Sequence, residues 1–207
     1  MEKPIIFSTE MVRAILAGRK TTTRRVIKPQ PVAGVRKSPF VKSGLEDGHG
    51  REIKPRYYPG DVLWVRETWA PCATIDSWLD DVNLYIYKAD FQDKEVSWKW
   101  KPSIHMPREA ARLFLRVISV RAERLQDITE EDALSEGMTQ SLRSVMGYAT
   151  SESEEEFNLT QVVSTFGLLW DSLNAKRGYG WDTNPWVWIV KFERVENYEG
   201  LGKDCTA

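Results

Sequence analysis

Alternating hydrophobic and polar residues predict several short strands along the chain. Residues 62–67 read VLWVRE, so successive side chains would point to opposite faces of a strand. Residues 112–125 alternate in the same way over a longer stretch, which predicts a long strand. Further strands are predicted at residues 4–7, 84–89, 96–101 and 186–195.

Apolar residues at helical spacing predict helices between these strands. The stripe within residues 11–16 follows Ser8 or Thr9, whose hydroxyl can accept a hydrogen bond from the free amides of the first turn. Gly18 then favours the left-handed conformation in which many helices end. A second helix is predicted at residues 129–137, between a threonine that can cap it and a glycine that stops it. A third, amphipathic helix is predicted at residues 162–174.

The remaining stretches lack a regular hydrophobic pattern. Prolines and glycines punctuate residues 26–58, which indicates a long surface insertion. Residues 139–158 are polar and acidic and indicate a second exposed insertion, and residues 197–207 are expected to form a frayed tail. Short strands dominate, two or three helices are interspersed, and no βαβ rhythm occurs. We therefore expect a single α+β domain over residues 1–196, built as a closed or nearly closed small β-barrel with helices at its rim.

Composition narrows the class of protein. The chain has 207 residues, of which 42% are hydrophobic, enough for a folded core. No apolar run approaches the roughly 18 residues of a membrane span, and the N-terminal apolar stretch is too short for a signal peptide. Cys72 and Cys205 have no metal-ligand spacing with each other or with His49 and His105, so we expect reduced thiols and no structural zinc. A cytoplasmic location fits these features.

The net charge of −1 hides an uneven distribution. Residues 11–66 contain thirteen basic and four acidic residues, a net charge of +9, whereas residues 127–157 contain nine acidic residues and one basic residue, a net charge of −8. A basic segment of this size suggests an anionic partner such as a nucleotide or a nucleic acid. The alternative is a solvated basic loop that faces the protein's own acidic segment.

Two places in the sequence offer candidate chemistry. The segment GRKTTTRR, residues 18–25, puts a lysine, hydroxyls and two arginines close together. An amine next to a hydroxyl can act as a base–nucleophile pair if burial or a nearby cation lowers the pKa of the lysine. Glu136 lies at the last turn of a predicted helix, where the helix dipole disfavours an acid, and such a placement is sometimes functional. The alternative readings are a capping threonine beside solvated cations, and a surface glutamate.

Aromatic residues gather in three segments, residues 64–69, 98–100 and 179–188. Nucleic-acid bases stack on aromatic faces. Core packing explains most of the nine tryptophans, and we assign a stacking role to one or two residues of the loop at 179–186.

With its predicted elements and motifs taken together, the chain resembles the ASCH family of the PUA-like superfamily. The resemblance lies in the segments VRAILAG, GRKTTTRR, PGDVLWVRETW, LQDITEEDALSEGM and WVWIVKFERV, in that order. The residues of these segments and the positions of the insertions are most similar to the phage- and prophage-encoded branch of the family. The resemblance implies a PUA-like small β-barrel with two or three flanking helices. Long insertions interrupt it at about residues 26–58, 70–110 and 139–158.

Small bacterial members of that family hydrolyse N4-acetylcytidine with a lysine, a threonine and a glutamate. Their pattern G-[RK]-K-T-x-T-x-R falls here on residues 18–25. The resemblance therefore implies catalytic roles for Lys20, Thr23 and Glu136, without a metal ion or another cofactor. Candidate substrate-binding residues are Arg24, Arg25, Glu67, Trp69, Tyr179 and Trp181.

Three functions are compatible with the sequence. The first is a metal-free amidohydrolase of an N-acylated cytidine-type base, with Lys20 as the base, Thr23 as the nucleophile and Glu136 orienting or shuttling a proton. The second is an RNA-binding module without catalysis, whose basic segment contacts phosphates. The third is a metal-independent ribonuclease that uses the same basic cluster. The expected partner is a nucleoside or RNA, and neither a membrane nor a metal.

Overall fold

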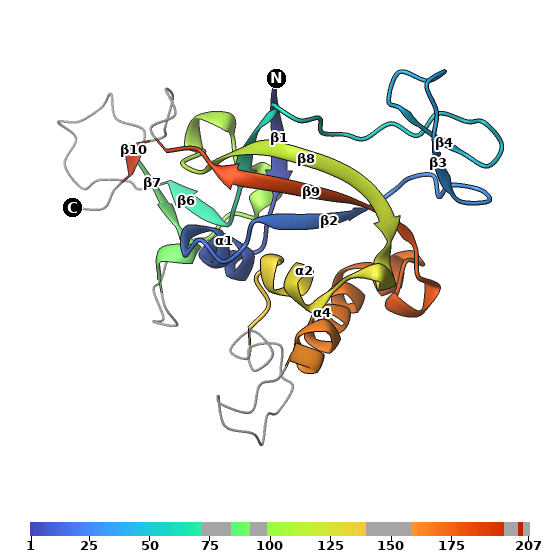
Figure 1. Ribbon diagram of the computed structural model, residues 1–207. Helices are drawn as coiled ribbons and strands as arrows, with labels where there is room; N and C mark the ends of the chain where they lie inside the picture. Colours follow the sequence, from blue (N-terminus) through green and yellow to red (C-terminus); the bar gives the residue numbers. More distant parts are fainter. Residues whose placement is uncertain (72–83, 92–98, 140–158, 197–202, 205–207) are drawn as a thin grey trace. The chain divides into compact units, whose positions relative to one another are not determined.

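The chain divides into two compact units. The computed structural model describes residues 1–71, 84–91, 99–139, 159–196 and 203–204 (Figure 1). Unit 1 comprises residues 1–18, 60–117 and 192–207, and unit 2 comprises residues 19–59 and 118–191. Two long strands, β8 (Phe114–Arg124) and β9 (Trp186–Arg194), have residues in both units.

The architecture is mixed α+β. A five-stranded sheet has the strand order β1-β5-β8-β9-β2, and smaller sheets of three and two strands accompany it. The α-helices of the described residues are α1 (Thr9–Leu16), α2 (Glu130–Ser135) and α4 (Leu159–Asn174). The α+β class with a multi-strand sheet and few helices is thus confirmed. The predicted insertion at residues 139–158 lies, apart from Thr139, outside the described residues.

Unit 1 is built on a parallel strand pair. Strand β1 (Glu2–Ile6) runs parallel to β5 (Val62–Arg66), and β5 pairs in antiparallel fashion with the start of β8. Pro4 is tolerated because β1 is an edge strand, where a missing amide hydrogen leaves no ladder partner unsatisfied. A cluster of buried aromatic and small residues forms the core beside these strands. Its members are Trp69, Tyr85, Tyr87, Met106, Ala110, Ala111 and Phe114.

A second sheet of unit 1 has the order β10-β7-β6. Strands β6 (Trp69–Pro71) and β7 (Leu84–Tyr87) are antiparallel, and β10 (Lys203–Asp204) pairs with β7 in parallel. Of residues 197–207, where a frayed tail was predicted, only Lys203 and Asp204 are among the described residues. The strand predicted at 96–101 lies largely outside the described residues, and Lys101 forms an isolated bridge with Trp69.

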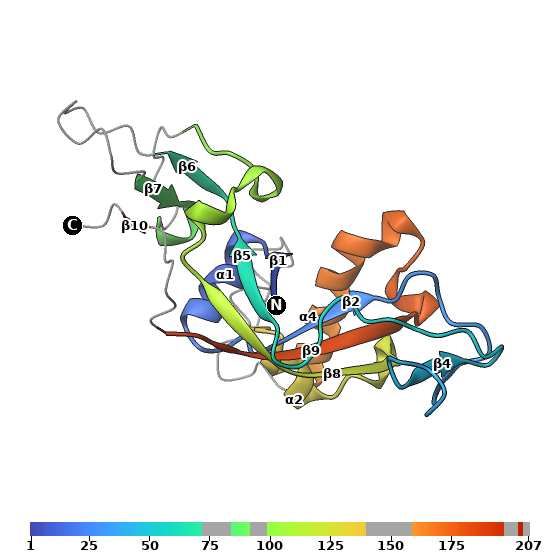
Figure 2. The ribbon, with the colours of Figure 1, turned by 90° about the horizontal axis from the view of Figure 1, so that it is seen from above.

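In unit 2, β2 (Thr22–Val26) runs antiparallel to β9, as the views in Figures 1 and 2 show. Thr23 lies opposite Val190 in this pair. Helices α2 and α4 lie on the same side of β2 in Figure 1, and α4 presents buried Phe166 and Trp170 as predicted. Leu173, in the last turn of α4, is 56% exposed.

Local capping explains where the first two helices begin and end. The Ser8 hydroxyl accepts a hydrogen bond from the amide of Met11 at 3.4 Å, and the Thr129 hydroxyl accepts one from the amide of Asp132 at 3.1 Å. Gly18 and Gly137 follow the two helices with φ angles of 71° and 89°, the left-handed region in which glycine has no Cβ clash.

The insertion at residues 26–58 contains regular structure that the sequence pattern did not reveal. Strands β3 (Val35–Lys37) and β4 (Leu45–Asp47) form an antiparallel ribbon. The buried carboxylate of Asp47 accepts hydrogen bonds from the amides of His49 and Arg51, each at 3.0 Å. Burial by itself raises the pKa of Asp47, but these backbone hydrogen bonds outweigh it and lower the pKa.

Candidate functional site

The segment GRKTTTRR enters β2 beside the end of α2. Lys20 forms an isolated antiparallel bridge with Glu136, and the amide of Thr21 donates to the carbonyl of Ser135 at 2.8 Å. Glu136 is the C-terminal cap residue of α2, and Gly137 then turns the chain away. Backbone pairing therefore fixes the two segments against each other before any side chain is considered.

A buried ion pair joins these two segments. Lys20 Nζ donates to Glu136 Oε2 at 2.6 Å and to the carbonyl oxygen of Glu136 at 2.9 Å. The side chains are only 2% and 5% exposed. Charged side chains are rarely buried to this degree unless each has a partner of opposite charge. Lys20 and Glu136 are that partner for each other. The structure thus brings together two of the three predicted catalytic residues, while their catalytic roles stay a prediction.

Arg24 and Asp132 extend this pair into a cluster. Arg24 Nη1 donates to Glu136 Oε1 at 3.3 Å, and Arg24 Nη2 donates to Asp132 Oδ2 at 2.7 Å. Its guanidinium also lies 5.8 Å from the centre of the Phe166 ring. We call these residues, Lys20, Arg24, Asp132 and Glu136, the Lys20 cluster. It contains two cations and two carboxylates, so its formal charges cancel.

The environment lowers the pKa of Lys20. Burial disfavours the ammonium and is the largest effect, the carboxylate of Glu136 opposes it, and the positive charges of Arg25 and Arg24 lower the pKa further. At a given pH, a larger fraction of Lys20 is thus in the neutral form that can accept a proton than is the case for an exposed lysine. Burial also lowers the pKa of Arg25, but a guanidinium stays protonated in proteins.

Thr23 is the third predicted catalytic residue and is 1% exposed. Side chains alternate along β2, so Thr23 and Arg25 belong to one face and Thr22 and Arg24 to the other. The structure thus places an amine of lowered pKa and a carboxylate together in unit 2, and Thr23 follows Lys20 by three residues on the same segment.

Arg24 was predicted to bind substrate, but its guanidinium is buried and used within the protein. Two of its nitrogens bind the carboxylates of Glu136 and Asp132, while Arg24 Nε has no hydrogen-bond partner among the described residues. The geometry favours a role in which Arg24 orients Glu136. Asp132 and Phe166, which sequence reasoning did not include in the site, hold Arg24 in place.

Tyr179 and Trp181 lie in unit 2 near α4. The Trp181 ring meets the Phe166 ring edge-on at 6.3 Å, and the amide of Trp181 donates to Asp171 Oδ1 at 2.6 Å. Lys28 Nζ lies 4.9 Å from the centre of the Tyr179 ring. Trp181 is therefore connected to the Lys20 cluster through Phe166, whereas Tyr179 is engaged by a cation outside that cluster.

Glu67 and Trp69 belong to unit 1, where they form part of its interior. Arg112 binds Glu67 through two hydrogen bonds of 3.0 and 3.2 Å and also binds Asp90. These carboxylates raise the pKa of Arg112 in spite of its burial. Trp69 packs edge-on against Tyr85, with the ring centres 5.5 Å apart. Both predicted binding residues thus have structural partners within unit 1.

The described residues contain no group of three or more His, Cys, Asp or Glu residues that could hold a metal ion. No α-helix among them is long and apolar enough to cross a bilayer.

Comparison of the chain with protein-family models, curated proteins and solved structures gave no match. The ASCH resemblance therefore rests on the motifs in the sequence alone.

Proposed function

We propose that this chain is an ASCH-type protein of the PUA-like class that hydrolyses the amide of an N-acylated cytidine-type base in the cytoplasm, without a metal ion. The observation that carries the proposal is the buried pair of Lys20 and Glu136, with a lowered pKa of Lys20, on the segment that also holds Thr23. Burial of an amine beside a carboxylate is costly for stability, and such groups are often found at functional sites.

In the first half of the proposed reaction, Lys20 reacts as the neutral amine, which its lowered pKa makes accessible, and Glu136 Oε2, 2.6 Å from Lys20 Nζ, orients it. The neutral amine then accepts the proton of the Thr23 hydroxyl, and the hydroxyl oxygen attacks the acyl carbon. Arg25 or backbone amides stabilise the oxyanion that forms. When the carbon–nitrogen bond breaks, the exocyclic nitrogen takes a proton from the Lys20–Glu136 pair and leaves as the amino group of cytidine.

In the second half, water attacks the ester on Thr23. Lys20 or Glu136 accepts one proton of this water, the ester bond breaks, and the Thr23 oxygen takes a proton back. The products are cytidine and a carboxylic acid, and the protein returns to its starting protonation state. Arg24 keeps one oxygen of Glu136 occupied, so the other oxygen faces Lys20 throughout.

One observation favours the alternative, an RNA-binding module without turnover. Lys20, Thr23, Arg24 and Glu136 are all buried, so a substrate reaches them only if part of unit 2 moves. In that alternative the Lys20 cluster is a structural element, and the exposed cations of unit 2 bind phosphates.

The test is release of acid from N4-acetylcytidine by the wild-type protein and by Lys20→Met. The proposal predicts turnover by the wild type and a loss of about 10²- to 10⁴-fold in the variant, because the base is gone. Circular dichroism and urea unfolding must show that the variant is folded. Absence of wild-type turnover on acylated nucleosides, together with RNA binding that weakens with salt, would select the binding module instead.

A further inference from the structure

The β3–β4 ribbon carries an exposed aromatic residue that the proposed hydrolase site does not use. Phe40, in the loop between the two strands, is 93% exposed. Single exposed apolar residues are common on protein surfaces, so Phe40 alone would mean little. The ordered loop that carries Phe40 and the basic residues next to it in the sequence give this exposed side chain its significance. We call residues 35–47 the basic ribbon.

The basic ribbon is a built element. Within it, the amide of Ser38 donates to the carbonyl of Gly44 at 3.0 Å, and the Ser38 hydroxyl accepts a hydrogen bond from the amide of Phe40 at 3.3 Å. At the end of the ribbon, Asp47 also forms a salt bridge with Arg51, in which Asp47 Oδ2 and Arg51 Nη2 are 3.0 Å apart. These contacts hold the loop in position, so Phe40 is presented on an ordered support.

Basic residues stand on both sides of Phe40 in the sequence. Arg36 is paired with Glu46 at 2.8 Å. Lys37 and Lys42 are exposed, and neither has a carboxylate partner within the described part of the chain. An exposed aromatic residue with a lysine on either side of it in the sequence suits a nucleic-acid strand, in which each base is flanked by phosphates.

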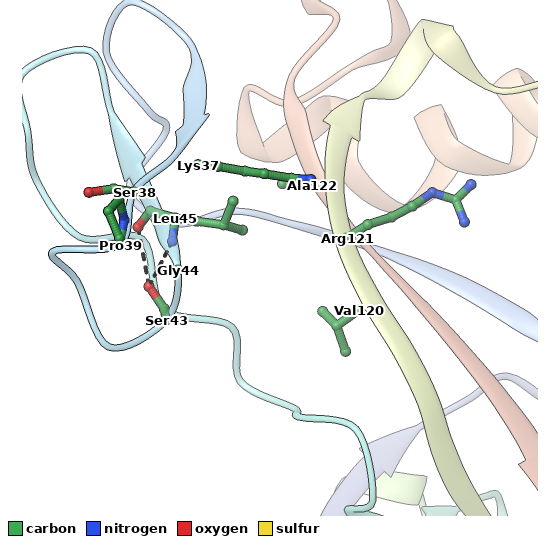
Figure 3. Close-up of a pocket in the computed structure, with 9 residues that line it drawn as sticks. All are labelled: Lys37, Ser38, Pro39, Ser43, Gly44, Leu45, Val120, Arg121 and Ala122. Atoms are coloured by element: carbon green, nitrogen blue, oxygen red, sulfur yellow. Dashed lines mark hydrogen bonds between the residues drawn. The ribbon is translucent and has the colours of Figure 1, made fainter.

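A cleft of about 600 Å³ lies between the basic ribbon and β8 (Figure 3). Leu45 and Val120 supply apolar surface, and Ser43 borders the cleft with its hydroxyl held by the backbone of Leu45. Lys37 extends along the cleft toward Ala122, whereas the guanidinium of Arg121 points away from the ribbon. That guanidinium lies 3.5 Å from Asp132 of the Lys20 cluster, so the cleft and the cluster share a neighbouring residue.

We propose that the basic ribbon and its cleft bind single-stranded nucleic acid, with Phe40 stacking on a base and Lys37 and Lys42 contacting phosphates. This inference deepens the proposed function, on which it rests for the nature of the bound molecule: the modified base would be accepted within a strand as well as in a free nucleoside. A single strand is favoured over a duplex because its bases are free to stack on an aromatic side chain.

The test is fluorescence anisotropy with fluorescein-labelled oligouridylate and oligothymidylate of about 12 nucleotides. Removal of two phosphate contacts in Lys37→Ala/Lys42→Ala should reduce the slope of log affinity against log salt by about 1.4. Phe40→Ala should weaken binding about 5- to 150-fold with an unchanged melting temperature, because its side chain is exposed. Comparison of the two oligonucleotides shows whether the 2′-hydroxyl contributes.

Matched controls come from another exposed part of unit 2. Lys176 and Arg177 lie in the short turn after α4, and Lys176→Ala/Arg177→Ala removes as much charge as the ribbon variant. Leu173→Ala removes another exposed apolar side chain, which is 56% exposed. The proposal predicts near wild-type binding by both control variants.

Four results would overturn the proposal. They are no binding of either oligonucleotide, equal weakening by the ribbon and control variants, tighter binding of a duplex, and equally effective competition by polyglutamate, which would reveal a site for acidic protein. None of these measurements requires turnover. Oligonucleotide binding without release of acid would refute the hydrolase and leave the ribbon site standing, and hydrolysis of free N4-acetylcytidine without oligonucleotide binding would do the reverse.

Discussion

Replacement of Glu136 by glutamine probes the buried ion pair most sharply. The change keeps the size of the side chain but removes the charge that Lys20 and Arg24 both contact. Burial already lowers the pKa of Lys20, and the carboxylate of Glu136 is the main effect that opposes it. Without this carboxylate, we expect the folded variant to release the proton of Lys20.

The size of the effect follows from the cost of removing that proton. For a lysine with the ordinary pKa of 10.5 in the unfolded chain, neutralisation costs about 4.8 kcal/mol at pH 7 and about 2.0 kcal/mol at pH 9. The unfolded chain then binds more protons than the folded variant, so the stability of the variant rises with pH in this range. We therefore expect a destabilisation of up to about 4.8 kcal/mol at pH 7, which shrinks toward about 2.0 kcal/mol at pH 9.

Urea unfolding at both pH values, followed by tryptophan fluorescence, measures this difference. In the double variant Lys20→Met/Glu136→Gln the extra pH dependence should disappear, because the titrating amine is absent. Glu46→Gln in the exposed Arg36–Glu46 pair is a matched control and should cost less than about 1 kcal/mol at either pH. Equal destabilisation by Glu136→Gln at pH 7 and pH 9 would refute the reasoning.

Three further outcomes are expected. Arg24→Met should destabilise the protein by about 3–5 kcal/mol in urea unfolding, because Glu136 and Asp132 both lose the buried guanidinium; a loss below about 1 kcal/mol would contradict this. Asp47→Asn should accelerate hydrogen exchange at the amides of residues 49 and 51, which donate to that carboxylate, and unchanged exchange would show that the carboxylate is dispensable. Under the proposed function, kcat/KM for N4-acetylcytidine should rise with pH and level off below pH 10.5, because the pKa of Lys20 is lowered from its ordinary value of 10.5. A value of kcat/KM that still rises at pH 10.5 would exclude Lys20 as the base.

Local signals in the sequence were sufficient for the elements that depend on neighbouring residues. Ser8 and Thr129 cap their helices through hydrogen bonds that span three residues, and the glycines after these helices act equally locally. The ribbon in residues 26–58 was missed because strands of three residues are too short to show an alternating pattern. Asp47, which secures the end of the ribbon, has no sequence signature because its hydrogen bonds come from backbone amides, which every residue has.

The candidate site was predictable only in part. Lys20 and Glu136 are 116 residues apart, and the ASCH resemblance, not their spacing, suggested that they meet. The roles of Arg24 and Asp132 in the cluster depend on how α2 packs beside β2, which no local pattern encodes. Glu67 was placed in the site, yet its carboxylate is bound by Arg112 within unit 1. Sequence shows that a charged residue is present, but tertiary structure selects its partner.

The most direct test of the central claim compares two substitutions of Thr23 in the hydrolysis of N4-acetylcytidine. Thr23→Val removes the hydroxyl from a buried position on β2 at nearly constant shape, and Thr23→Ser retains it. With both variants shown to be folded, the account predicts that initial rates fall by about 10⁴- to 10⁶-fold in Thr23→Val. Thr23→Ser should stay within about 10²-fold of the wild type, because its nucleophile is preserved. Turnover by Thr23→Val within about tenfold of the wild-type rate would contradict the claim that Thr23 attacks the amide.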